Sequence, residues 1–75
     1  MWTDLGFDWV PARGLEYTVL VQRSDDGVLR ALVSADGEVD VEVSIREARG
    51  YVFDNSTLPT AIIEHIEKVL EREVE

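Results

Sequence analysis

Apolar and polar residues alternate along most of the chain up to residue 53, a pattern typical of strands with one buried and one solvent-facing side. The clearest segment is 39–46, where β-branched residues occupy every odd position and polar or charged residues every even one. The alternation predicts five strands, over about residues 4–10, 15–23, 28–34, 38–46 and 51–53.

Tetrapeptides that end in glycine separate these strands, at 11–14, 24–27, 34–37 and 47–50. Each suits a three-residue hairpin loop, in which a type I turn is followed by a left-handed glycine that closes a bulge. Such loops keep residues of the same parity opposite each other, and a one-residue slip would turn a strand's side chains to the other face. The turns therefore predict a five-stranded antiparallel β-meander.

The odd-numbered positions of the predicted strands are apolar, so we expect them to form the core face of the sheet. The small residue Ala31 marks the expected point of close approach for a helix. The turn spacing predicts two cross-strand rows, one of Phe7, Val19, Val33 and Val39 and one of Leu5, Val21, Ala31 and Val41. The predicted core face comprises Leu5, Phe7, Trp9, Leu15, Tyr17, Val19, Val21, Leu29, Ala31, Val33, Val39, Val41, Val43, Ile45, Tyr51 and Phe53.

A single helix is predicted over about residues 59–73. It follows a cluster of capping side chains at 54–57, and Pro59 suits the first helical position because a helix start does not need its amide hydrogen. Apolar residues then recur at helical spacing and predict one buried stripe. The stripe consists of Ala61, Ile62, Ile63, Ile66, Val69 and Leu70.

Together these elements predict an α+β fold, a single domain over residues 1–75 with the helix packed on one face of the sheet. A chain of 75 residues buries only about 60% of the surface that its unfolded form exposes, so the core is small. It contains no cysteine, which excludes disulfides and thiolate sites. No signal-like segment and no apolar run of ~20 residues is present, and we expect a soluble, cytoplasmic protein without membrane contact.

The charge balance is strongly acidic. Sixteen Asp and Glu residues against seven Lys and Arg give a formal net charge of −9. This argues against direct binding to nucleic acid or to anionic membranes, and it favours a basic protein surface as partner. Acidity that serves only solubility, or adaptation to the host, is the alternative.

Candidate chemistry is sparse. His65 is the only histidine and borders the helix stripe, where no nucleophile is predicted beside it, so we interpret it as structural. Asp25, Asp26 and Asp36 lie in short turns without the ligand spacing of a calcium loop. The glycines end hairpins and do not join a strand to a helix as phosphate-binding loops do. The sequence predicts no catalytic residue, no metal site and no cofactor.

The even-numbered face of the sheet is the candidate binding surface. Leu20 is predicted opposite Leu32, forming an apolar island within an acidic ring, and Arg30 is predicted opposite Glu42 as an ion pair. Trp2 lies on the same side, where it either covers the leucines or contacts a partner; two exposed leucines are also ordinary on a surface. The predicted partner-binding residues are Asp8, Glu16, Leu20, Leu32, Asp40 and Glu42, with Glu64, Glu67 and Glu71 on the helix as the alternative surface.

Three functions follow from these features. The first is a small acidic protein that occupies a basic surface of a larger, nucleic-acid-handling protein as an inhibitor or nucleic-acid mimic. Phage anti-defence proteins are analogous in size and acidity, although no motif matches one. The second is an assembly subunit that forms a homo-oligomer through sheet edges or the leucine face, so the chain is expected as a monomer or homodimer. An enzyme is the third and least supported.

Overall fold

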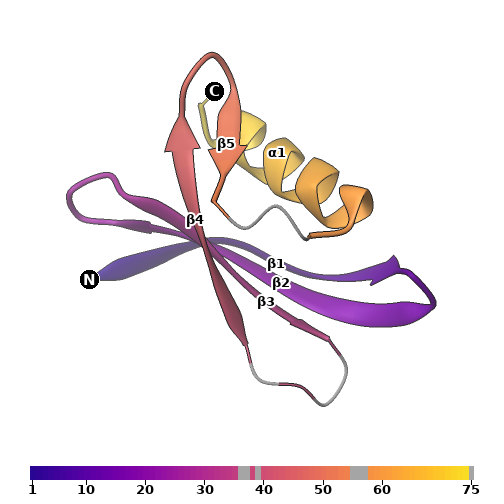
Figure 1. The fold of residues 1–75 in the computed structure, drawn as a ribbon. Coiled ribbons are helices and arrows are strands. Elements are labelled where there is room, and N and C mark those ends of the chain that lie inside the picture. The colour runs from indigo at the N-terminus through magenta and orange to yellow at the C-terminus, as the bar shows by residue number, and fades with distance from the viewer. Residues whose placement is uncertain (36–37, 39, 55–57, 75) are drawn as a thin grey trace.

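The computed structural model describes residues 1–35, 38, 40–54 and 58–74. Its strands form one open antiparallel sheet in the order β1-β2-β3-β4-β5, and the helix packs on one face of it (Figure 1). The predicted α+β fold, with a five-stranded meander and one C-terminal helix, is confirmed. The elements are β1 (Trp2–Ala12), β2 (Leu15–Ser24), β3 (Leu29–Ala35), β4 (Val41–Glu47), β5 (Tyr51–Phe53) and α1 (Thr60–Val74).

Two of the predicted hairpin loops have the expected register. Between β2 and β3, Val19 faces Val33 and Leu20 faces Leu32, and Gly27 has the left-handed φ of 86° that the loop requires. Between β4 and β5, Ile45 faces Phe53, as the predicted loop at 47–50 requires. These turns therefore place the strand faces as the sequence predicted.

The β3–β4 hairpin keeps the predicted parity but is shifted by two residues. Val33 faces Val41 and Ala31 faces Val43, whereas we expected Val33 opposite Val39 and Ala31 opposite Val41. A shift of two residues leaves every side chain on the predicted face of the sheet, because side chains along a strand alternate between the two faces. Gly37 and Val39, on which the predicted turn depended, lie outside the described residues.

The β1–β2 hairpin contradicts the predicted loop. Ala12 pairs with Leu15, so only Arg13 and Gly14 form the turn, and both have positive φ, 52° and 74°. Positive φ at both central residues defines a type I′ turn, whose twist matches that of the strands better than a type I turn. Because the loop is one residue shorter than predicted, the pairing in the adjoining part of β1 shifts by one residue. The side chains of that part therefore lie on the opposite face of the sheet from the one predicted.

This inversion overturns the prediction that Phe7 and Trp9 belong to the core. Phe7 lies opposite Leu20 and Trp9 opposite Thr18, on the face away from the helix, and their exposed fractions are 55% and 61%. Val10, which we had not placed in the core, is buried in their stead.

A bulge between Asp4 and Gly6 restores the predicted register in the first part of β1. Before the bulge, Asp4 pairs with Gln22, as a three-residue loop would have required. Because the bulge adds one residue to β1, Leu5 still packs against the core as predicted.

The core lies between the helix and the facing side of the sheet. Leu15 and Val41 were predicted to belong to it but are about half exposed, because each is the first residue of its strand. Ala61 was placed in the helix stripe but is exposed in the first turn, and Ile63 is only partly buried. The buried residues are Val10, Val19, Val21, Leu29, Ala31, Val33, Val43, Ile45, Ile62, Ile66, Val69 and Leu70.

The helix makes its close approach to the sheet at Gly6. It packs mainly over β1 and β2, whereas we expected the contact at Ala31 in β3. A Cβ atom at Gly6 would lie 3.1 Å from Val69 Cγ1, which is tighter than ordinary van der Waals contact. The missing side chain therefore lets α1 sit against the bulged part of β1.

We expect Gly6→Ala to destabilise the protein by about 1–3 kcal/mol, because the added methyl group overpacks against Val69. Urea denaturation of Gly6→Ala, Val69→Ala and the double variant tests this. The double variant should lose less stability than the sum of the single changes, since Val69→Ala makes room for the methyl group. Additive losses would show that the two positions do not contact each other.

The two-residue turn makes a second prediction. Arg13→Asn should stabilise the protein by roughly 0.5–1 kcal/mol, because Asn tolerates positive φ and Asn-Gly is a preferred type I′ turn. The matched control is Arg23→Asn, which removes the same charge from a regular strand position and should not stabilise. A three-residue loop, in which residue 13 has negative φ, would give Arg13→Asn no such advantage.

Candidate functional site

The sheet face opposite the helix, here called the outer face, has an apolar centre that runs across three strands. Phe7, Leu20 and Leu32 lie directly opposite one another in β1, β2 and β3, and we call them the apolar row. Trp9 adjoins this row, and its ring packs edge-on against Phe7 with centroids 6.3 Å apart at 84°. The predicted leucine island therefore exists and is enlarged by two aromatic side chains.

A polar row runs beside the apolar row and links four strands by side-chain hydrogen bonds. Gln22 Nε2 donates to Asp4 Oδ1 at 2.8 Å, and Arg30 Nε donates to Gln22 Oε1 at 2.9 Å. Arg30 Nη1 then donates to Glu42 Oε2 at 3.0 Å, which confirms the predicted ion pair. In the backbone register Glu42 faces Leu32, so the pair is diagonal.

Trp2 stacks on this polar row. The Arg30 guanidinium carbon lies 3.7 Å from the centroid of the Trp2 ring, a cation–π geometry. Of the two roles considered for Trp2, covering the leucines or meeting a partner, the structure shows neither directly. Instead, Trp2, Gln22 and Glu42 together hold the Arg30 side chain, which is 21% exposed. Hydrogen bonds and the cation–π contact thus hold the polar row in place.

The remaining predicted partner-binding residues separate into two groups. Glu16 and Asp40 are exposed, with Glu16 on the outer face and Asp40 immediately before β4. The structure moves Asp8 to the helix side, opposite Val19, because the two-residue turn inverts this part of β1. Asp8 is therefore removed from the predicted outer-face set.

Sequence reasoning missed Phe7 and Trp9 as surface residues. The alternation of apolar and polar residues favoured Phe7 and Trp9 as core residues. The opposite register would place Gly6 and Asp8 on the face that packs against the helix. The available signal was the Arg13-Gly14 dipeptide together with apolar Val10 at an even position. A local conflict between hydrophobic pattern and turn chemistry is typical of functional surfaces.

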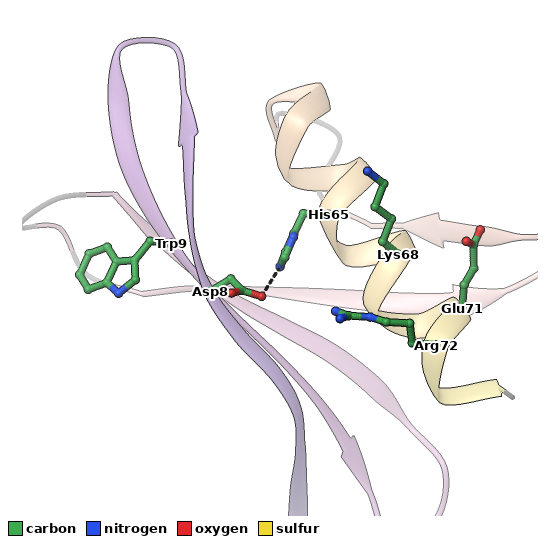
Figure 2. Close-up of a pocket in the computed structure, with 6 residues that line it drawn as sticks. All are labelled: Asp8, Trp9, His65, Lys68, Glu71 and Arg72. Atoms are coloured by element: carbon green, nitrogen blue, oxygen red, sulfur yellow. Dashed lines mark ion pairs between the residues drawn. The ribbon is translucent and has the colours of Figure 1, made fainter.

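A second feature is an open hollow of about 570 Å³ between the edge strand β1 and the helix (Figure 2). His65 Nε2 lies 3.2 Å from Asp8 Oδ2 but forms no hydrogen bond with the described residues, so the pair is close without being well aligned. The Trp9 indole points away from His65. The hollow is lined by Asp8, Trp9, His65, Lys68, Glu71 and Arg72.

The lining of the hollow supplies acid, base and cationic groups but no serine, threonine or cysteine nucleophile. The His65 side chain is 21% exposed and extends from α1 toward Asp8 in β1. The alternative surface predicted on the helix carries exposed Glu64 and Glu71 and partly buried Glu67, with Lys68 among them. It lacks an apolar centre comparable with that of the outer face.

Among the described residues, no group of three or more His, Cys, Asp or Glu side chains is placed to hold a metal ion. The helix in the described part of the chain is too short and too polar to cross a bilayer. The chain matches no protein-family model, no curated protein and no solved structure.

If the outer-face aromatics serve binding and not folding, their removal should cost little stability. We expect Phe7→Thr combined with Trp9→Thr to lower the free energy of unfolding by no more than about 1.5 kcal/mol, the worth of an exposed aromatic pair. Ile66→Ala, which truncates a fully buried side chain, should lower it by about 2–5 kcal/mol. Comparable losses in thermal or urea unfolding would place the aromatics in the core.

Proposed function

We propose that this protein is a small acidic binding module whose outer face docks on a basic surface of a larger protein. The observation that carries the proposal is the outward apolar row, extended by Trp9, on a chain whose only described helix covers the other face. Exposed aromatic side chains beside aliphatic ones resemble the centre of a protein interface.

The composition of this surface suits tight local binding. Trp and Arg are the residues that most often dominate interface energies, and the outer face presents Trp2, Trp9 and Arg30 beside the apolar row. Arg30 is already held by Gln22 and Glu42, so little side-chain entropy remains to be lost on binding.

The charge of the chain supports a basic partner. The net charge of −9 produces a long-range attraction for cationic surfaces, and exposed Glu16 and Asp40 add carboxylates to the rim of the outer face. A protein that handles nucleic acid offers such a surface, where carboxylates take the positions of phosphates. Occupying that surface would inhibit the partner, so an inhibitor that mimics nucleic acid is the specific form of this proposal.

The test begins with capture of the partner and continues with binding kinetics. Asp40→Lys with Glu16→Lys should slow association, and higher salt should slow it further, because the attraction is screened over about 8 Å at physiological ionic strength. Leu32→Ala should instead speed dissociation, since an apolar contact acts after the two surfaces have lost their water. Surface-capture measurements of both rates separate these effects.

The matched control is Glu64→Lys with Glu71→Lys, which changes the net charge equally on the helix surface. This control should slow association less than the outer-face pair does. Equal slowing by both pairs, together with unchanged dissociation of Leu32→Ala, would transfer the site from the outer face to the helix surface. Association that does not respond to salt would exclude a charge-steered partner.

A further inference from the structure

The free edge of β1 is the longest unpaired strand edge in the described part of the chain. The sheet has β1 and β5 as its edges, and β1 has 11 residues whereas β5 has three. Unpaired edges offer backbone donors and acceptors to another strand, so proteins usually block long ones. Here the bulge after Asp4 and Pro11 interrupt the edge at either end, leaving a regular window at residues 6–10.

The turn determines which backbone groups face outward in this window. In a two-residue hairpin the flanking residues, Ala12 and Leu15, form a hydrogen-bonded pair, and hydrogen-bonded and non-hydrogen-bonded pairs then alternate. Asp8 and Val10 therefore direct their backbone groups to β2. Phe7 and Trp9 direct their N–H and C=O groups to the free edge.

We propose that two copies of this chain pair through β1, antiparallel about a twofold axis beside Asp8. In this register Phe7 of each copy lies opposite Trp9 of the other, which gives two such pairs. The two residues of each pair exchange both backbone hydrogen bonds. Aromatic cross-strand pairs are among the most favourable in antiparallel sheets. The Phe7–Trp9 contact within each chain is thereby extended into a cluster of aromatic rings across the axis.

The charge beside the edge is compatible with a second acidic copy. Lys68 and Arg72 line the hollow next to β1, and neither forms an ion pair with another described residue. Figure 2 shows the Arg72 guanidinium directed toward β1, whereas the Glu71 carboxylate points away from it. Asp8 and Glu71 balance these two cations in the lining of the hollow, so the edge is close to neutral in a chain of net charge −9, and two copies repel each other least here.

In the dimer the two Asp8 carboxylates lie near the axis, flanked by Lys68 and Arg72 of both copies. This arrangement offsets the repulsion between two like-charged side chains that face each other across a pair of strands. A twofold interface of this kind pairs the β1 edges of both copies with each other, so neither edge is left free for a third copy. The opposite side of the sheet offers only two short edges for further pairing, the three-residue strand β5 and the first residues of β4, which β5 does not cover.

The inference goes beyond the proposed function, because a shared sheet would join two outer faces into one continuous surface. Its test uses the purified protein alone. Sedimentation over rising protein concentration should show a monomer–dimer equilibrium, and salt should strengthen the dimer by screening the repulsion between two acidic chains. This salt response is opposite to that expected for a basic partner, so each proposal can fail without the other.

Amide hydrogen exchange locates the contact. The Phe7 and Trp9 amides should exchange rapidly in dilute protein and become at least about tenfold slower when the dimer forms, because only they gain hydrogen bonds at the edge. The Asp8 and Val10 amides, already bonded to β2, serve as internal references and should change less. A dimer that leaves the Phe7 and Trp9 amides unprotected would use another surface and would overturn the proposal.

Charge variants complete the test. Arg72→Glu should weaken the dimer at least about tenfold, and Arg49→Glu, an equal charge change at the β4–β5 turn, should weaken it less. Leu32, in β3, belongs to the surface that the proposed function assigns to partner binding. Leu32→Ala should therefore leave dimerisation unchanged. A protein that remains monomeric up to about millimolar concentration would overturn the proposal, as would equal weakening by the two arginine variants.

Discussion

The turn at Arg13 and Gly14 determines on which side of the sheet the second half of β1 presents its side chains. Two residues connect the strands, both in the left-handed region, and the register that follows places Asp8 and Val10 toward the helix. Phe7 and Trp9 consequently meet solvent. The outer face, the hollow beside α1 and the backbone groups at the free edge of β1 all depend on this one connection.

The bulge between Asp4 and Gly6 makes the inverted segment compatible with the rest of the fold. Without the extra residue, the first part of β1 would also be inverted, and Leu5 would be lost from the core. With it, Leu5 packs inward and Gly6 lies beneath Val69, so α1 can approach a strand that contributes few large buried side chains. The turn and the bulge are two compensating departures from regular pairing in one edge strand.

The sequence contained enough information for the sheet order, the helix and most of the core, because alternation and helical spacing are strong in β2, β3, β4 and α1. Val19, Val21, Val33 and Ile45 were placed correctly since their strands are covered on one face only. The helix stripe was correct at Ile62, Ile66, Val69 and Leu70, where burial follows the helical period.

The candidate site was less predictable, and the reason lies in β1. Hydrophobic periodicity assumes that large apolar side chains seek the core, but Phe7 and Trp9 do not. The loop length could not be read from glycine position alone, because Arg13 adopts a positive φ that most residues avoid. Leu20 and Leu32 were found because β2 and β3 obey the simple rule, and the polar row was only partly anticipated, through Arg30 and Glu42.

The polar row also has a mechanical consequence. Its hydrogen bonds run across the strands, from Asp4 through Gln22 and Arg30 to Glu42, whereas the covalent chain runs along them. Such a connection opposes sliding of neighbouring strands past one another, because a shift would break the side-chain hydrogen bonds as well as those of the backbone. Under the proposed function, the surface beside this row is therefore already ordered when a partner binds.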